Sequence, residues 1–213
     1  MSQPNANAKL QEEIKRYVQA HRDAQSALKE CELVRADGND GLIVPSLNEF
    51  RSVAEHIEYY FSADRVEQAE DELAEMVTHL RRAAYDAYQA QIQFYLRKCQ
   101  DFDNDYRQIC IVEILGTFVA DRQVAQGIIK EISAEKRDDL NNRGKYAEQK
   151  KEQLAKLKDI NERWEIARQE LNKKIAADDR QRAGDKKERK RSKIQFWLML
   201  AITAASVIVA VCK

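Results

Sequence analysis

Apolar residues recur every three to four positions along most of the chain, which is the pattern of amphipathic α-helices. The pattern predicts a first helix over about 8–34, a second over 46–61 and a third over 62–100. A run of turn-forming residues, Arg-Ala-Asp-Gly-Asn-Asp-Gly at 35–41, separates the first two helices. Three successive helices at the front of the chain indicate a helical bundle.

The second predicted helix begins with Ser46-Leu47-Asn48-Glu49, which has the form of a capping box. In that motif Ser46 is the N-cap, and the side chain of Glu49 reaches back to the backbone N–H of the cap. An apolar stripe follows along the helix. Its members are Leu47, Phe50, Ala54, Ile57 and Phe61.

The twelve residues 109–120 are apolar apart from Glu113 and Thr117. A helix that crosses a bilayer needs about 20 apolar residues, so this run is too short. We therefore expect it to form the central, buried helix of the bundle, after a break at 101–105 and continuing to about Leu140.

From Lys145 to Lys193 the charges are dense and the apolar residues are few. The apolar positions that remain have the three-and-four spacing of a helical seam. They are Leu157, Ile160, Trp164, Ala167 and Leu171. Two interpretations stay open: a solvated helical stalk that contacts the bundle with its middle, and a short coiled coil.

The nineteen residues from Ile194 to Cys212 carry no charge. As a helix they would be about 28 Å long, close to the thickness of a bilayer's hydrocarbon core, so they are predicted to form one transmembrane helix. Phe196 and Trp197 lie at the edge of the segment, where aromatic side chains favour the membrane interface.

A cluster of bases comes directly before this segment, and we expect it to contact anionic lipid headgroups. Its members are Lys186, Lys187, Arg189, Lys190, Arg191 and Lys193. The positive-inside rule then places the rest of the protein in the cytoplasm, as a tail-anchored, single-pass membrane protein. General composition favours a bacterial inner membrane.

Within the apolar segment, Ala201 and Ala205, and likewise Ser206 and Ala210, are small residues four positions apart. Such spacing lets transmembrane helices approach closely, which predicts packing of the segment against a second copy. The chain is therefore a candidate homo-oligomer.

Composition supports an all-α fold, since only two prolines and six glycines occur among 213 residues. The expected organisation is a disordered start (1–7), an antiparallel helical bundle (8–140), a charged stalk or short coiled coil (141–193) and a transmembrane segment (194–212). Four widely spaced cysteines indicate free thiols. No spacing of ligands predicts a metal site or a cofactor.

Outside residues 186–193 and Lys213, the chain has 29 basic and 35 acidic residues. This negative balance does not favour nucleic-acid binding. We expect a non-enzymatic adaptor, scaffold or membrane effector whose bundle binds a protein partner or itself. The expected docking surface is an aromatic face of the third helix, made of Tyr85, Tyr88, Phe94 and Tyr95.

Two spacings resemble the Arg-x4-His motif of the HEPN helical-bundle ribonucleases: Arg16 with His21, and Arg51 with His56. The resemblance implies a metal-independent ribonuclease in which Arg51 holds the phosphate and His56 moves the proton of the 2′-hydroxyl. At 100° per residue, however, these two side chains point about 140° apart on a helix.

A heptad region beside a membrane anchor also resembles the SNARE proteins. With Gln153 as the central polar layer, the seam from Leu157 to Leu171 fills five successive layers. The resemblance implies a fusion protein that pairs with partner helices. The next layers would hold Lys174 and Asp178, and charges at such positions oppose coiled-coil pairing.

Overall fold

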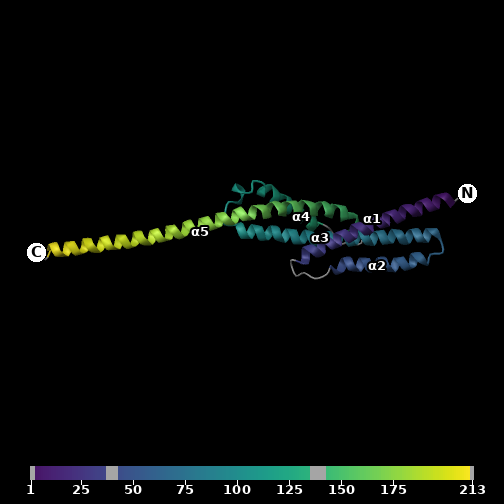
Figure 1. The fold of residues 1–213 in the computed structure, drawn as a ribbon, viewed down its shortest axis with the longest axis horizontal. Helices are drawn as coiled ribbons and strands as arrows, with labels where there is room; N and C mark the ends of the chain where they lie inside the picture. The colour runs from purple at the N-terminus through teal and green to yellow at the C-terminus, as the bar shows by residue number, and fades with distance from the viewer. Residues whose placement is uncertain (1–2, 37–42, 135–142, 212–213) are drawn as a thin grey trace.

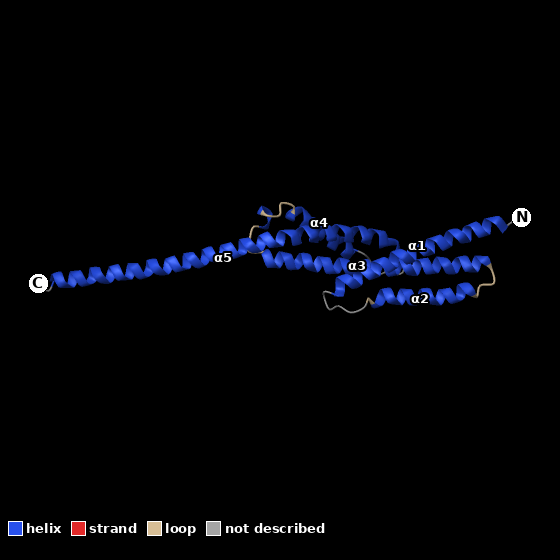
Figure 2. Cartoon of the chain, in the orientation of Figure 1, coloured by secondary structure: helices blue, strands red, loops and turns tan. Residues whose placement is uncertain are grey.

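The computed structural model of the protein describes residues 3–36, 43–134 and 143–211. Within these ranges, side chains are described for residues 8–34, 43–134 and 143–199. The described chain is helical almost throughout and contains no strand (Figure 2). The prediction of an all-α helical bundle is therefore confirmed.

The described chain contains five α-helices and two short 3₁₀ segments. The labelled elements are α1 (Gln3–Ala36), α2 (Val44–Phe61), α3 (Val66–Tyr106), the 3₁₀-helix η1 (Ile111–Glu113), α4 (Phe118–Ala134) and α5 (Ala147–Val211). The second 3₁₀ segment, 143–146, lies directly before α5. The central element is α3, which packs extensively against α1, α2 and α5. Figure 1 shows α2 running antiparallel to α3, and the second half of α5 extending beyond the other helices.

The first hydrophobic core lies where α1, α2, α4 and α5 meet α3. Small side chains line the contact between α1 and α3, among them Ala24, Ala27 and Ala87, so the two helices can approach closely. Gln91 of α3 is fully buried there, and its Nε2 donates a hydrogen bond of 3.1 Å to the carbonyl oxygen of Ala27. This bond fixes α1 along α3.

The second core is aromatic and lies between the end of α3, the segment 111–118 and α5. Trp164 of α5 is 2% exposed, and its ring centroid lies 4.8 Å from that of Phe102 and 5.1 Å from that of Phe118. Rings at these distances add to the stability gained from burial.

The prediction of a buried helix over 109–120 is wrong. Only η1 and the start of α4 are helical in this run. Ile111, Leu115 and Phe118 are buried in the second core, while Val112 is 46% exposed. The run therefore contributes separate apolar side chains to the second core from a largely irregular segment, and not the face of a continuous helix.

The boundaries of α2 and α3 also differ from expectation. Ser46 is not an N-cap: α2 begins at Val44, and the buried hydroxyl of Ser46 donates a hydrogen bond of 3.0 Å to the carbonyl oxygen of Ala83. The expected break at 101–105 is absent, since α3 continues to Tyr106. Burying Phe102 and Tyr106 in the second core outweighs the turn preference of the intervening polar residues.

One unbroken helix, α5, joins the bundle to the apolar segment. All five residues of its seam, Leu157 to Leu171, are buried in this chain's own cores. Packing extends to Ile175, well past residue 140, and residues 179–199 are all exposed.

The predicted transmembrane helix lies mostly among residues whose side chains are not described. In the part of the chain that is described, no helix is long and apolar enough to cross a bilayer. Of the segment 194–212, side chains are described only as far as Met199. The transmembrane helix stays a prediction.

Candidate functional site

Two histidines and three glutamates gather where α2 crosses α3, and we call them the histidine cluster: Glu49, His56, Glu72, Glu75 and His79. The helices place them in pairs. Glu49 and His56 lie seven residues apart on α2, and Glu72 and His79 lie seven apart on α3. Because the two helices are antiparallel, each glutamate is brought opposite the histidine of the other helix.

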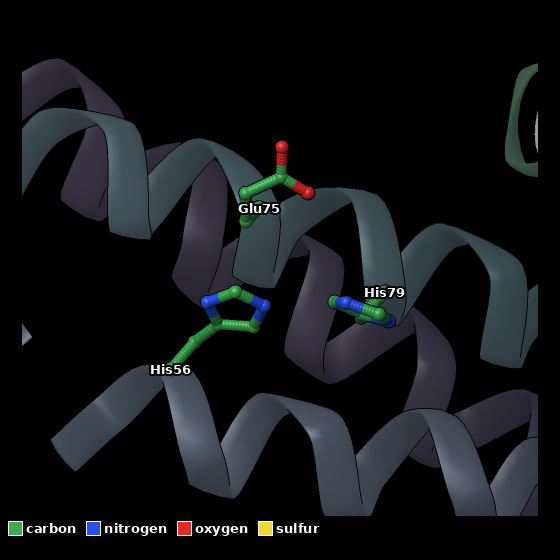
Figure 3. A group of neighbouring side chains, drawn as sticks. All are labelled: His56, Glu75 and His79. Carbon is green, nitrogen blue, oxygen red and sulfur yellow. The ribbon is translucent and has the colours of Figure 1, made fainter. Parts of the chain in front are cut away.

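Each histidine of the cluster is held by one carboxylate. The distance from His56 Nδ1 to Glu72 Oε2 is 2.7 Å, and that from His79 Nδ1 to Glu49 Oε2 is 2.6 Å. The ring centroids of the two histidines are 5.2 Å apart. Figure 3 shows the two rings side by side with an edge of each toward the other, and the carboxylate of Glu75 beside the gap between them. All four paired side chains are between 12% and 24% exposed.

Arg143 extends the network on the side of Glu49. Its guanidinium pairs with Glu49 and donates hydrogen bonds of 3.1 and 3.2 Å to the carboxylate of Asp86. Burial raises the pKa of Asp86, and Arg143 offsets part of this rise. The next residue, Gly144, lies so close to α3 that an added Cβ would be 3.0 Å from the Cβ of Arg81. Glycine at this position therefore lets Arg143 reach its partners.

Three members of the cluster could hold a metal ion. His56, Glu75 and His79 each offer a ligand atom, and these atoms lie within 4.8 Å of one another. No metal site was predicted from the sequence, because His56 is on a different helix from the other two residues. A usable signal was the Glu75-x3-His79 spacing, which places both side chains on one face of a helix.

The structure does not bring the arginine and the histidine of either ribonuclease-like motif together. Arg51 is exposed, whereas His56 is half-buried against α3 and paired with Glu72. In the other copy of the motif, Arg16 pairs with Glu13 at 2.7 Å. His21 lies between aromatic rings, with centroids 6.1 Å from those of Tyr17 and Phe50.

The expected aromatic docking face is partly covered. Tyr88 is 8% exposed and belongs to the first core. Tyr85 is half-buried, with the ammonium group of Lys150 at 5.5 Å from its ring centroid. Phe94 and Tyr95 are also half-buried, and their centroids are 5.3 Å apart. This surface is smaller than the sequence suggested.

More accessible aromatic side chains lie at the end of α2. Phe61 is 81% exposed and Tyr59 is 57% exposed. Phe61 was expected on the inner stripe of its helix together with Ala54 and Ile57, and all three are exposed, so that assignment is wrong for these residues. In Figure 1 the turn after α2 lies at the opposite end of the molecule from the exposed half of α5.

The residues expected to contact lipid are all on α5. Lys186, Lys187, Arg189, Lys190, Arg191 and Lys193 are exposed. The small residues Ala201, Ala205, Ser206 and Ala210, expected to pack in the membrane, lie outside the residues with described side chains.

A second polar network joins α4 to α5 at the edge of the second core. The Asp121 carboxylate is 6% exposed and accepts hydrogen bonds from Arg163 at 2.6 Å, Thr117 at 2.9 Å and the Trp164 indole at 3.2 Å. Burial alone would raise the pKa of Asp121, but these three donors together hold it below its usual value. The network is satisfied within the chain and is structural.

Comparisons with protein-family models, with curated proteins and with solved structures find no match to this chain.

Proposed function

We propose that the protein is anchored in a membrane by segment 194–212 and uses its helical bundle to bind a protein partner or a second copy of itself. The basic cluster at 186–193 contacts anionic headgroups. The bundle lies on the cytoplasmic side of the membrane, and the membrane that we favour is a bacterial inner membrane. The support for anchoring comes from the sequence: an uncharged segment of nineteen residues with bases directly before it.

The observation that carries the proposal is the continuity of α5. Its first part is packed in both cores, and the same helix runs on through the exposed basic cluster into the apolar segment. From Leu171 to Ile194 the rise is on the order of 35 Å at 1.5 Å per residue. A stiff helix of this length would hold the bundle away from the bilayer and transmit a rotation or tilt between the two.

The exposed aromatic side chains at the end of α2 support a binding role. Tyr59 and Phe61 lie on the side of the bundle that would face away from the membrane. Exposed aromatic residues are enriched at sites of protein–protein contact. We call Tyr59 and Phe61 at the end of α2 the tip. The tip is a better docking candidate than the aromatic face of α3, since Tyr88 is buried.

Anchoring is tested by reconstituting full-length protein with liposomes and floating them through a density gradient. We compare the wild type with a variant carrying Ile202→Arg and Val207→Arg, because arginine at the centre of a membrane helix costs about 2.5–3.5 kcal/mol. Wild-type protein should float at both low and high salt, whereas the variant, which keeps the basic cluster, should be released from anionic liposomes at high salt. Wild-type protein that is released by high salt would be bound by its bases alone, which contradicts anchoring.

Binding through the tip is tested by cross-linking in intact cells that express full-length protein. Tyr59→Ser and Phe61→Ser together should abolish the main cross-linked species, whether it is a dimer or a complex with another protein. The matched control is Ile166→Ser, since Ile166 is an apolar residue of α5 that is 72% exposed. Equal loss in both variants, or in neither, would refute the assignment of the tip.

A further inference from the structure

The geometry points to a binding site for a divalent transition-metal ion of the zinc type, formed by His56 of α2 with Glu75 and His79 of α3. Imidazole nitrogen and carboxylate oxygen are the ligands that zinc takes from proteins besides thiolate. Neither the anchoring nor the docking proposal requires this site.

The first argument is that each histidine is already oriented as a metal ligand. Glu72 and Glu49 bind the Nδ1 atoms of His56 and His79. A carboxylate on Nδ1 fixes the tautomer with its proton there and leaves Nε2 as the lone-pair donor. Histidines that bind metal ions nearly always have such a partner on the other nitrogen. Figure 3 shows each ring turning one nitrogen toward the other ring.

The second argument is distance. In a tetrahedral site with metal–ligand bonds of about 2.0–2.2 Å, neighbouring ligand atoms are about 3.3 Å apart. The three candidate atoms lie within 4.8 Å of one another, so each pair must close by about 1.5 Å or less. Glu75 is exposed, and rotation of its long side chain can shorten its distances to both histidines. The distance between the ligand atoms of His56 and His79 has to close through rotation of these two side chains.

The third argument is charge. The carboxylates of Glu49, Glu72 and Glu75 surround the two rings. The Arg143 guanidinium lies on the far side of Glu49 and is shared with Asp86. A dication between the rings would therefore meet a surplus of negative charge at short range, where screening by solvent is incomplete because the pairs are half-buried.

Two histidines and one glutamate would fill three positions of a tetrahedral ion. The fourth position would face the solvent beside Glu75 and would hold water, as in metal sites that keep an open position. The ion would also join α2 to α3, since His56 is the ligand that α2 supplies. Metal binding should thus stabilise the contact between these two helices.

The test uses untagged full-length protein in detergent micelles, titrated with Co²⁺ and then with Zn²⁺. A four-coordinate site should give visible Co²⁺ absorption that saturates at one ion per chain and disappears when Zn²⁺ is added. His56→Gln and His79→Gln should each abolish the spectrum. The control is His21→Gln, which removes the third histidine of the chain and should leave the spectrum and the stoichiometry unchanged.

A positioning role for Glu72 is tested separately. Glu72→Gln should weaken Co²⁺ binding about 10- to 100-fold while leaving the shape of the spectrum unchanged, as expected for the partner of a ligand. Far-UV circular dichroism and the midpoint of thermal unfolding of each variant without metal show whether it is folded. Wild-type protein without a Co²⁺ spectrum, or a His21→Gln spectrum lost as fully as that of His56→Gln, would overturn the site.

Discussion

Replacing Asp121 with asparagine should destabilise the protein strongly, although the two side chains have nearly the same shape. Asp121 is 6% exposed and accepts hydrogen bonds from three donors: Arg163, Thr117 and Trp164. Asparagine offers one acceptor oxygen, and its NH₂ group would face one of these donors. One charge-assisted hydrogen bond is worth about 1.5–3 kcal/mol, and a buried donor left without an acceptor costs about 1–3 kcal/mol. Arg163 is 36% exposed and partly hydrated, which reduces its share. We therefore expect a loss of about 2–4 kcal/mol in the free energy of unfolding.

The assay is urea unfolding of full-length protein in mild detergent, followed by far-UV circular dichroism. The matched control is Asp159→Asn, since Asp159 also pairs with Arg163 but its side chain is 67% exposed. An exposed pair four residues apart on a helix is worth about 0.3–0.5 kcal/mol. The chemical change and the arginine partner are the same, so the two variants differ in burial and in the hydrogen bonds from Thr117 and Trp164.

The effect of Asp121→Asn should also depend on pH. The folded state lowers the pKa of Asp121, so its ionised form contributes stability at every pH above the unfolded value of about 3.9. That contribution is lost as the pH falls through the lower, folded pKa. The difference between wild type and variant should thus be constant near neutrality and shrink below about pH 4. Equal losses in Asp121→Asn and Asp159→Asn at pH 7 would refute the reasoning.

Two further predictions concern a close helix contact and the thiols. Gly144→Ala should lower the free energy of unfolding, because the added Cβ would lie 3.0 Å from the Cβ of Arg81. Gly127→Ala, in the middle of α4 where nothing lies within 4 Å of an added Cβ, should raise the free energy of unfolding by up to about 1 kcal/mol. Urea unfolding of both variants checks the opposite signs. Iodoacetamide followed by mass spectrometry should modify exposed Cys110 in native protein at pH 8 and leave Cys99 intact, since burial raises the pKa of Cys99 to about 11. Rapid native labelling of Cys99 would contradict the second core.

The periodicity of apolar residues was enough to predict the helices of the bundle, because most of the chain buries one stripe of each helix. It failed where burial by another element decides the local structure. The polar residues at 101–105 read as a break, yet Phe102 and Tyr106 have partners in α5 and keep α3 intact. Conversely, the apolar run at 109–120 reads as a helix but fills the second core as an irregular segment.

The histidine cluster could not be found from the sequence for a different reason. His56 and His79 are 23 residues apart, and which residues of two antiparallel helices face each other depends on the turn between them and on their packing. Ser46 was misread for the same reason. Its sequence neighbourhood fits a capping box, but its hydroxyl bonds to Ala83 across the contact between α2 and α3.

Membrane anchoring by segment 194–212 is tested most directly by alkaline carbonate extraction of membranes from cells that express full-length protein. Carbonate opens vesicles and removes proteins held by charge alone, whereas a transmembrane helix stays in the bilayer. We predict that the wild type remains in the membrane pellet and that the variant with Ile202→Arg and Val207→Arg is recovered in the supernatant. Recovery of the wild type in the supernatant would contradict the proposal that this segment spans the bilayer.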